Sequence, residues 1–360
     1  MKHNRSKRIL FTGGGSAGHV TVNAALIPSF LNEGWQVSYI GSVNGIESQL
    51  VGRMEGVAYF GIATGKLRRY VDLQNVKDPF RVMKGVYQAY RLIRKLKPDV
   101  LFSKGGFVSV PVVLGAWLNR VPVLIHESDL TPGLANRIAI PFAQAVCVTF
   151  EQTARTLKGG KSVHIGPIIR QELLQGRASR GLNWCKFTPG KPVLLIMGGS
   201  LGASKINQMV RKHVRELTSQ YQIIHICGKG QLDSSLQLPG YLQFEYIHDE
   251  LPDVLAAADI VISRAGSNSI FEFLALRKPM LLIPLSKASS RGDQILNAEL
   301  FEQDGYGKVL LEDEMTDERF LQSLEWVYVN KDQIAETMKR KENGNALGKL
   351  TALIRDTAKS

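Results

Sequence analysis

The chain has 360 residues, of which 44% are hydrophobic and 21% are charged, and its formal net charge at pH 7 is +13. This length predicts two domains with buried cores. The excess of Lys and Arg favours acidic partners: nucleic acid, phosphorylated substrates or an anionic membrane surface. No recognised nucleic-acid-binding motif accompanies the charge, so we expect no nucleic-acid partner.

Cysteine spacing and hydropathy exclude several other classes of protein. The three cysteines stand far apart in the sequence, which excludes a CxxC redox or zinc site. No apolar run reaches the roughly 18 residues of a membrane-spanning helix, and the first residues lack the apolar core of a signal peptide. The longest candidate, 108–125, is interrupted by Asn119, Arg120 and two prolines. We therefore expect a protein of the reducing cytoplasm whose membrane contact is peripheral.

In the first half of the chain, short apolar runs alternate with segments of helical periodicity. This alternation is typical of a parallel sheet with helices on both faces. The pattern predicts strands at 8–12, 36–40, 100–102, 123–126 and 145–149. It predicts helices between them at 20–33, 80–96 and 110–118.

A polar stretch containing Gly and Arg, 175–190, separates this pattern from a second one. The second pattern also opens with a strand, a glycine turn and a helix, and it predicts strands at 192–197, 222–227, 242–246, 260–263 and 280–283. We therefore predict two doubly wound α/β domains, 1–165 and 166–334, facing each other across a cleft, with ligands at the carboxyl ends of the strands. A C-terminal helix over about 335–360 is predicted to pack back on the first domain.

A glycine-rich turn, Gly13 to Gly18, follows the first strand and opens a helix. Gly13, Gly15 and Gly18 match the GxGxxG pattern of a dinucleotide site, but the second strand ends without the carboxylate that such a site uses for the ribose. The turn can bind a phosphate or serve only helix–sheet packing. His19 lies in the first helical turn, where an imidazolium is disfavoured, so a neutral imidazole there can take a proton or merely hydrogen-bond a loop.

Two motifs in the second half suit a nucleotide. The glycine turn 198–203 adds the hydroxyl of Ser200 and can cradle a pyrophosphate. After a later apolar strand, Ser267 is predicted to cap a helix. Glu272, one turn into that helix, lies on nearly the same face as Asn268 and can accept both hydroxyls of a ribose. A plain capping arrangement with a solvated acid is the alternative.

A third polar helix start follows the strand at 280–283. Asp293, Gln294 and Asn297 share a face there, and side chains of this kind orient sugar hydroxyls, although an ordinary polar helix N-terminus has the same pattern. No Asp-x-Asp pair occurs in these motifs. We therefore expect neither a bridging metal nor a cofactor.

Together these motifs resemble the MurG family of UDP-GlcNAc:undecaprenyl-diphospho-muramoylpentapeptide N-acetylglucosaminyltransferases, over nearly the whole chain. The resemblance is carried by GGGSAGHV (13–20), SKGGFVSVP (103–111), HESDLTPGLANR (126–137), GGSLGA (198–203), SRAGSNSIFE (263–272) and DQILNA (293–298). It implies a GT-B fold of two Rossmann-like domains. It also implies an inverting transfer of GlcNAc from UDP-GlcNAc to the C4 hydroxyl of lipid I, which gives lipid II in peptidoglycan synthesis.

The resemblance implies that the C-terminal domain holds most of the UDP-GlcNAc. By position, Ser200 meets the diphosphate and Glu272 meets the ribose. The backbone of Ile247 meets the uracil, Gln294 meets the GlcNAc hydroxyls, and Arg170 lies near the nucleotide. The other residues assigned to the UDP-GlcNAc site are Ser16, Gly18, Arg264, Ser267 and Asp293.

The resemblance places the acceptor on the N-terminal domain. His19, Glu127 and Asp129 are the catalytic candidates, and we favour His19 as the base that takes the proton of the attacking hydroxyl. The residues assigned to acceptor binding are Gly105, Gly106 and Asn136. The sequence departs from the usual family pattern where Ser128-Asp129 replaces Gln-Asn, and Asp129 can therefore alter which group serves as the base. It departs again where Asp293 replaces a glutamine and where Pro167 replaces an asparagine.

Because lipid I is anchored in the membrane, the resemblance implies a peripheral enzyme on the cytoplasmic face of the cell membrane, in contact with other cell-wall synthesis proteins. Two segments, 66–70 and 80–84, mix basic, aromatic and aliphatic residues and suit an anionic bilayer surface. A solvated basic face over ordinary core residues is the alternative.

Three other functions fit parts of the pattern. A glycosyltransferase acting on another lipid, such as diacylglycerol, keeps the fold and donor, but the motif at 126–137 favours the cell-wall acceptor. A UDP-GlcNAc 2-epimerase shares the architecture without an acceptor. A two-lobed solute-binding protein without catalysis is disfavoured by the missing export signal.

Overall fold

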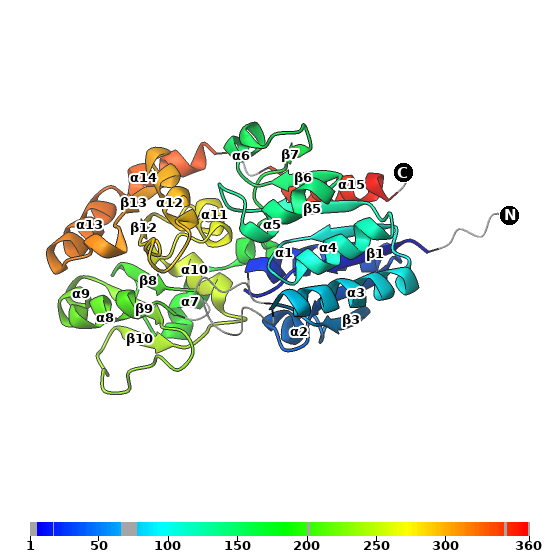
Figure 1. The fold of residues 1–360 in the computed structure, drawn as a ribbon. Helices are drawn as coiled ribbons and strands as arrows, with labels where there is room; N and C mark the ends of the chain where they lie inside the picture. The colour runs from blue at the N-terminus through cyan, green and yellow to red at the C-terminus, as the bar shows by residue number, and fades with distance from the viewer. Residues whose placement is uncertain (1–5, 17, 66–77, 200–201, 342–343, 359–360) are drawn as a thin grey trace. The chain divides into compact units, whose positions relative to one another are not determined.

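The computed structural model describes residues 6–16, 18–65, 78–199, 202–341 and 344–358. The chain forms two compact units, which we call unit 1 (Met1–Ile168 with Gly344–Ser360) and unit 2 (Ile169–Asn343). In Figure 1 the colour of unit 1 runs from blue to green and ends in the red C-terminal helix, so this unit is built from both ends of the chain.

The centre of unit 1 is a seven-stranded sheet in the order β3-β2-β1-β4-β5-β6-β7, and all its neighbouring strands are parallel. Every side chain of β4 and β5 is buried, which explains why apolar composition alone predicts them. The strands are β1 (Arg8–Thr12), β2 (Gln36–Ser42), β3 (Val57–Ile62), β4 (Val100–Ser103), β5 (Val123–Glu127), β6 (Ala145–Val148) and β7 (Ser162–His164).

Helices cover both faces of this sheet (Figure 1). Alternate side chains of β1 enter different cores, because successive residues of a strand point to opposite faces. Ile9 and Phe11 pack with α1 and α15, whereas Leu10 packs with α3 and α4. The helices of unit 1 are α1 (Gly18–Asn32), α2 (Ile46–Leu50), α3 (Asp78–Leu96), α4 (Ser109–Leu118), α5 (Leu134–Ala139), α6 (Glu151–Thr156) and α15 (Ala346–Thr357), with a 3-10 turn η2 (Ile140–Phe142).

The end of the chain differs from the prediction of one helix over about 335–360. Two helices are present instead: α14 (Lys331–Lys339) belongs to unit 2 and α15 belongs to unit 1. The new helix starts at an N-cap, because the side chain of Asn345 accepts a hydrogen bond from the N–H of Gly348 over 2.8 Å. Leu350 and Ile354 of α15 are then fully buried in the core beside α1.

Unit 2 contains a six-stranded parallel sheet in the order β10-β9-β8-β11-β12-β13. The strands are β8 (Val193–Met197), β9 (Gln222–Ile226), β10 (Tyr241–Phe244), β11 (Ile260–Ser263), β12 (Met280–Leu282) and β13 (Gly307–Val309). The helices that accompany them are α7 (Ala178–Cys185), α8 (Ser204–Lys212), α9 (Val214–Gln220), α10 (Leu251–Ala257), α11 (Ser267–Ala275), α12 (Asp293–Gln303), α13 (Asp317–Val329) and α14, with 3-10 turns η3 (Gln171–Gln175) and η4 (Glu312–Glu314).

The polar stretch 175–190 is part of the folded body of unit 2. It forms α7, which packs on α10, and the ring of Trp184 stacks on Phe244 with centroids 4.9 Å apart. Asp253 of α10 accepts hydrogen bonds from the N–H of Arg177 and the guanidinium of Arg180. The charges that made this stretch look like a separator are thus hydrogen-bond partners of the neighbouring helix.

Both sheets follow the doubly wound order 3-2-1-4-5-6 when their strands are counted within each unit. The order reverses between β1 and β4 in unit 1 and between β8 and β11 in unit 2, and ligands of such sheets bind outside the carboxyl ends of strands at this switch point. The prediction of two doubly wound units is confirmed. Among the described residues, no helix combines the length and the apolarity needed to cross a bilayer.

Candidate active site

In unit 1, two glycine turns follow the neighbouring strands β1 and β4 and interlock at the switch point. The N–H of Gly14 donates to the carbonyl oxygen of Gly105 over 3.3 Å. A Cβ atom on Gly106 would collide with the carbonyl oxygen of Gly14, and φ of Gly106 is +84°, which side chains rarely allow. Glycine is therefore required at 106, and the two turns form one edge of the site.

His19 lies in the first turn of α1, against the first glycine turn. Its Nδ1 atom lies 2.9 Å from the carbonyl oxygen of Gly14 and 3.1 Å from Oγ of Ser16. Because a carbonyl oxygen only accepts, we assign the hydrogen to Nδ1 and the lone pair to Nε2. The N-terminus of α1, which starts at Gly18, disfavours an imidazolium. The structure therefore places the imidazole of His19 against the carbonyl of Gly14 and the hydroxyl of Ser16, one residue after Gly18.

Glu127, the last residue of β5, is 4% exposed, and both of its carboxylate oxygens accept hydrogen bonds. Oε1 accepts from the N–H of Asp129 over 3.0 Å, and Oε2 accepts from the N–H of Gly133 and the side-chain amide of Asn136, each over 2.9 Å. Burial raises the pKa of Glu127 and the charge of Asp129 adds to this, while Lys104 and the hydrogen bonds oppose it. The carboxylate thereby fixes the loop after β5.

The predicted acceptor residues Gly105 and Asn136 meet beside this loop. Asn136, which is 5% exposed, donates to the carbonyl oxygen of His126 over 3.1 Å in addition to Glu127. Its Oδ1 has no hydrogen-bond partner among the described residues. A Cβ atom on Gly105 would lie 2.8 Å from that oxygen, so glycine at this position keeps the space beside the amide clear.

Lys104 is a residue of this region that the sequence analysis missed. It is 1% exposed, and its Nζ donates to Oγ of Ser128 over 2.8 Å. Burial lowers the pKa of this lysine, and the carboxylates of Glu127 and Asp129 act in the opposite direction. A lysine placed between a buried strand and a glycine pair was the available signal, since such a charge needs a specific partner.

Glu47 is a second missed residue. The second strand ends without a carboxylate, as predicted, but Glu47 of the following helix reaches back to the first glycine turn. It is 1% exposed and comes from α2, directly after β2. Its Oε2 accepts from the N–H of Gly15 over 3.2 Å. Its Oε1 accepts from the N–H and the hydroxyl of Ser42, over 2.9 and 2.5 Å. The first glycine turn thus already binds a carboxylate of the protein itself.

In unit 2, two residues predicted for the nucleotide are paired with each other. Glu272 of α11 is 7% exposed, and Arg170 binds it through two parallel hydrogen bonds, Nε to Oε1 at 2.8 Å and Nη2 to Oε2 at 3.0 Å. α11 begins at Ser267 with Gly266 at the N-cap, which corrects the predicted N-cap at Ser267. The first two turns of this helix therefore carry a buried carboxylate paired with a guanidinium, beside the N–H groups that a helix start leaves without intrahelical partners.

Arg264, also predicted for the UDP-GlcNAc site, serves the fold. It is 9% exposed, its Nη1 donates to the carbonyl oxygens of Ile283 and Pro284 over 3.0 and 3.3 Å, and it forms an ion pair with buried Glu312. These bonds tie the end of β11 to the loop after β12. These contacts of Nη1 support the turn that leads into α11.

The helix α12 starts at Asp293, after Gly292 in the left-handed conformation. Its first two turns bond to the loop after β12 and to the residues before α11. Oε1 of Gln294 accepts from the N–H of Leu285 over 3.1 Å, and the carboxylate of Asp293 lies 3.8 Å from the guanidinium of Arg291. One turn later, the amide of Asn297 donates to the carbonyl of Ala265 over 3.3 Å. The starts of α11 and α12 therefore lie side by side.

Of the remaining predicted residues, the structure describes Ile247 but not Ser200. Ile247 follows β10 and is 8% exposed. Ser200 lies outside the described residues. On either side of it, the N–H of Gly202 donates to the carbonyl of Gly199 over 2.9 Å, and a Cβ atom on Gly202 would collide with the carbonyl of Cys227. The second glycine turn is thus packed against the carboxyl end of β9.

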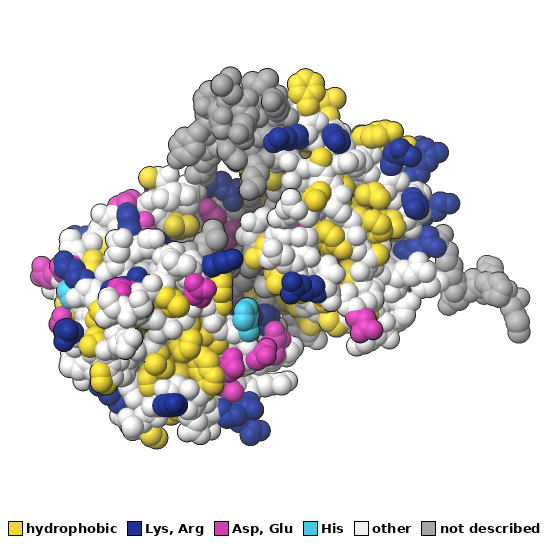
Figure 2. All heavy atoms as spheres, turned by 90° about the horizontal axis from the view of Figure 1, so that it is seen from below, with side chains coloured by type: hydrophobic (Ala, Val, Ile, Leu, Met, Phe, Trp, Pro, Cys, Tyr) yellow, Lys and Arg dark blue, Asp and Glu magenta, His cyan; other side chains and the backbone are white. Residues whose placement is uncertain are grey.

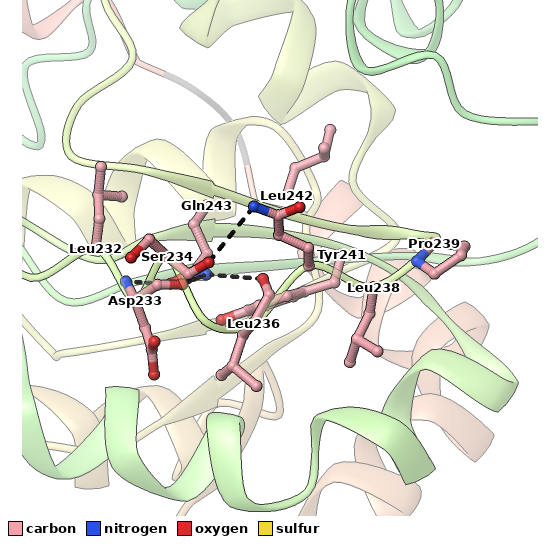
Figure 3. Close-up of a pocket in the computed structure, with 10 residues that line it drawn as sticks. Leu232, Asp233, Ser234, Leu236, Leu238, Pro239, Tyr241, Leu242 and Gln243 are labelled. Atoms are coloured by element: carbon pink, nitrogen blue, oxygen red, sulfur yellow. Dashed lines mark hydrogen bonds between the residues drawn. The ribbon is translucent and has the colours of Figure 1, made fainter.

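A surface cavity of about 560 Å³ in unit 2 contains none of the predicted residues. It lies over the loop between β9 and β10, where the side-chain amide of Gln243 bonds to the backbone of Asp233 and Leu236 (Figure 3). Half of its lining residues are Leu or Pro, and none belongs to the glycine turns 13–18 and 198–203. The lining residues are Leu232, Asp233, Ser234, Leu236, Gln237, Leu238, Pro239, Tyr241, Leu242 and Gln243.

Comparison with known families covers both units. The glycosyltransferase family 28 N-terminal domain matches residues 9–148, and the glycosyltransferase family 28 C-terminal domain matches residues 193–352. A crystal structure of a glycosyltransferase, CalG4, superimposes on 98% of this chain and 95% of its own with a TM-score of 0.68 at 14% identity, which shows the shared fold. Two doubly wound units with glycine turns at their switch points thus define a GT-B glycosyltransferase of family 28.

Relatives narrow the assignment further. The chain is 58% identical, over 98% of its length and 99% of the relative's, to the UDP-N-acetylglucosamine–N-acetylmuramyl-(pentapeptide) pyrophosphoryl-undecaprenol N-acetylglucosamine transferase of Geobacillus thermodenitrificans. It is 52% identical, over 98% and 100%, to a transferase of the same name from Bacillus thuringiensis. The crystal structure of Acinetobacter baumannii MurG matches 97% of this chain and 99% of its own with a TM-score of 0.77 at 25% identity. The chain belongs to the MurG family.

Proposed function

We infer that this protein transfers N-acetylglucosamine from UDP-GlcNAc to the muramoyl sugar of lipid I, producing lipid II for peptidoglycan. The observation that carries this inference is the 58% identity over 98% of the chain to a transferase named for this donor and acceptor. At such identity, the alternatives of a 2-epimerase, a diacylglycerol glycosyltransferase and a solute-binding protein lose their main support.

On the donor side, we propose that Glu272 accepts the two ribose hydroxyls of UDP-GlcNAc. Its carboxylate is fixed in the second turn of α11, and Arg170 already neutralises it through the bidentate pair. Arg170 then stands beside the diphosphate, where a guanidinium and the N-terminus of α11 stabilise the charge that develops on the leaving UDP. Ser200, the backbone of Ile247 and the first turn of α12 complete this proposed site.

On the acceptor side, we propose His19 as the general base. The C4 hydroxyl of the muramoyl sugar attacks the anomeric carbon of GlcNAc, and its proton passes to Nε2 of His19. A new C–O bond forms as the bond from the anomeric carbon to the β-phosphate oxygen breaks, and UDP leaves with inversion. The tautomer fixed by the carbonyl of Gly14 supports this role. Both oxygens of Glu127 already bind its own loop, which supports a positioning role for that residue.

The remaining acceptor contacts belong to the interlocked turns of unit 1. By the resemblance to the family, Gly105, Gly106 and Asn136 would receive the muramoyl sugar, and Asn136 is fixed beside them through its hydrogen bonds to His126 and Glu127. Asp129 lies beside Glu127, because its N–H donates to Oε1 of Glu127 over 3.0 Å. We propose that this pair of acids orients the acceptor.

We further propose that unit 1 binds the anionic membrane surface through α3. Phe80, Met83 and Tyr87 are 71%, 68% and 60% exposed and recur at helical spacing, with exposed Lys84 and Arg91 on the same face. Figure 2 shows hydrophobic side chains interspersed with Lys and Arg over the unit that carries the N-terminus. A helix face of this composition inserts aromatic groups between lipid headgroups. The predicted segment 66–70 lies outside the described residues.

The deciding experiment is transfer of label from UDP-[¹⁴C]GlcNAc to purified lipid I in detergent, with and without EDTA. Label in the lipid fraction in both arms would support the reaction and its independence of metal. Binding of UDP-GlcNAc with label transferred only to a different lipid would redirect the acceptor assignment. Formation of UDP-ManNAc without lipid would identify an epimerase and overturn the proposal.

A further inference from the structure

The N-terminal glycine turn is filled from within the protein. Glu47 is 1% exposed, and its carboxylate accepts three hydrogen bonds. The N–H of Gly15 and the N–H and hydroxyl of Ser42 donate to it. The hydroxyl of Tyr59 donates to the carbonyl of Ser42 over 2.6 Å and so braces the same loop. A buried carboxylate with this many donors is held in one place.

The surrounding backbone is shaped to fit this carboxylate. A Cβ atom on Gly14, Gly41 or Gly45 would in each case collide with the side chain of Glu47. Glycines in a turn of this kind let backbone approach a ligand closely, and the ligand is usually a phosphate. Here the closely approached group is the protein's own acid, at 3.2 Å from the N–H of Gly15.

We infer that Glu47 is a positioning residue, an internal anion that takes the phosphate place of the first glycine turn and thereby holds His19 for the acceptor hydroxyl. This inference rests on the proposed function. The link runs through the backbone, because the turn residue Gly14 packs on the carboxylate and its carbonyl oxygen accepts the Nδ1 hydrogen of His19. The first glycine turn therefore positions His19 for proton transfer, and other parts of the protein bind the diphosphate.

The test uses the full-length enzyme, UDP-[¹⁴C]GlcNAc and lipid I. In Glu47→Ala the turn loses its anion and His19 loses its fixed support, so we expect kcat to fall about 10²-fold, the usual cost of a misplacement near 1 Å. The KM for UDP-GlcNAc should stay within about twofold of the wild-type value, because the donor residues lie in unit 2. Formate, a free carboxylate, should restore part of kcat in this variant and leave the wild type unchanged.

A second readout asks whether the emptied turn accepts a phosphate. Inorganic pyrophosphate should inhibit Glu47→Ala in competition with lipid I, and it should inhibit the wild type much less at the same concentration. Tyr59→Phe is the matched control, because it removes a hydroxyl from the same loop and leaves the carboxylate in place. It should keep the wild-type response to formate and pyrophosphate.

The outcomes separate this inference from the proposed function. An inactive wild type would refute the proposed function alone. An active wild type with a Glu47→Ala kcat within about threefold, or with no response to formate and no new pyrophosphate inhibition, would overturn the role of Glu47. If Glu47→Ala does not fold, Glu47→Gln decides, because it keeps the shape and loses the charge. A fall in kcat of about tenfold or more at unchanged donor KM supports the inference, and an unchanged kcat overturns it.

Discussion

The two units have the same sheet order and the same strand–glycine turn–helix opening, but they differ in the charges placed at their switch points. In unit 1 the glycine turn binds the carboxylate of Glu47, and a histidine follows it. In unit 2 the carboxylate, Glu272, lies on the helix after the fourth strand and is paired with Arg170. The shared topology fixes where ligands approach, and a few charged side chains decide which chemistry each unit performs.

The largest difference between the two units is expected for substitution of His19, which should lower kcat without changing donor binding. Replacing it with Ala removes the proposed base, so kcat should fall by about 10²–10⁴-fold, while UDP-GlcNAc binding in unit 2 is unchanged. Transfer kinetics and calorimetric titration of UDP measure the two quantities. His164→Gln, an exposed histidine of the same unit, is the control and should retain full activity. A fall of less than about tenfold would leave another residue as the base.

Substitution of Glu272 in unit 2 should instead weaken donor binding and leave the KM for the acceptor unchanged. Glu272→Ala removes the acceptor of two ribose hydroxyls and leaves Arg170 without its partner. UDP-GlcNAc should therefore bind about 10²–10⁴-fold more weakly, given about 1.5–3 kcal/mol for each hydrogen bond to a charged group. The KM for lipid I should hardly change. Glu47→Gln in unit 1 is the matched carboxylate variant and should leave donor affinity within about twofold. A shift in the lipid I KM instead would reverse the assignment of the units.

A smaller difference is expected in how strongly the surfaces of the two units bind anionic lipid. Reversing Lys84 and Lys95 on α3 to Glu should weaken binding to vesicles of anionic lipid by at least about thirtyfold. Loss of the two basic residues removes about 1 kcal/mol each, and the new carboxylates add repulsion. Co-sedimentation at low salt measures the change. Arg215→Glu with Lys229→Glu makes the same charge change on exposed residues of unit 2 and serves as the control. Equal losses in both double variants would indicate a response to net charge alone.

The smallest expected effect is a pH dependence of stability in unit 2. His225 is fully buried between Tyr241 and Asn207, and burial, together with the charge of Arg211, lowers its pKa to about 3. Its folded pKa lies below its unfolded value, so the unfolded chain binds more protons between about pH 3 and 6.5 and stability falls as the pH falls.

This histidine should contribute about 1 kcal/mol of lost stability between pH 7 and 5.5, which hydrogen exchange of the β9 amides can report. The measurement compares the wild type with His225→Gln at each pH, so that the intrinsic pH dependence of exchange cancels. The variant should lose this part of the acid sensitivity. Identical acid sensitivity in both proteins would show that the histidine is already protonated in the folded state.

The prediction from sequence succeeded where the signal was local. Strands with both faces buried, such as β1, β4 and β8, consist of nearly uninterrupted apolar residues. The edge strands β3, β7 and β13 were not predicted. β7 and β13 are only three residues long, and β3, although apolar, is half-buried or exposed over most of its length. The glycine turns and His19 were found because a turn, a helix start and a following histidine occupy only seven consecutive residues.

Two of the residues now central to unit 1 could not be found in this way. Glu47 is 32 residues from Gly15, and Lys104 is 24 residues from Ser128. Each reads in the sequence as an ordinary charged residue near a turn. Only the folded sheet, which gathers the ends of β1, β2, β4 and β5 at one edge, supplies the partners that make burial of these charges tolerable.

The sequence by itself determined the family, the two doubly wound units and the positions of the glycine turns, because these depend on residue periodicity and on short motifs that survive without knowledge of contacts. The tertiary structure alone decided that Arg170 pairs with Glu272, that Arg264 supports a loop, that the final helices divide between the units and that Glu47 fills the first turn. These are contacts between residues distant in the chain, and their energies depend on burial and distance, which no local pattern records.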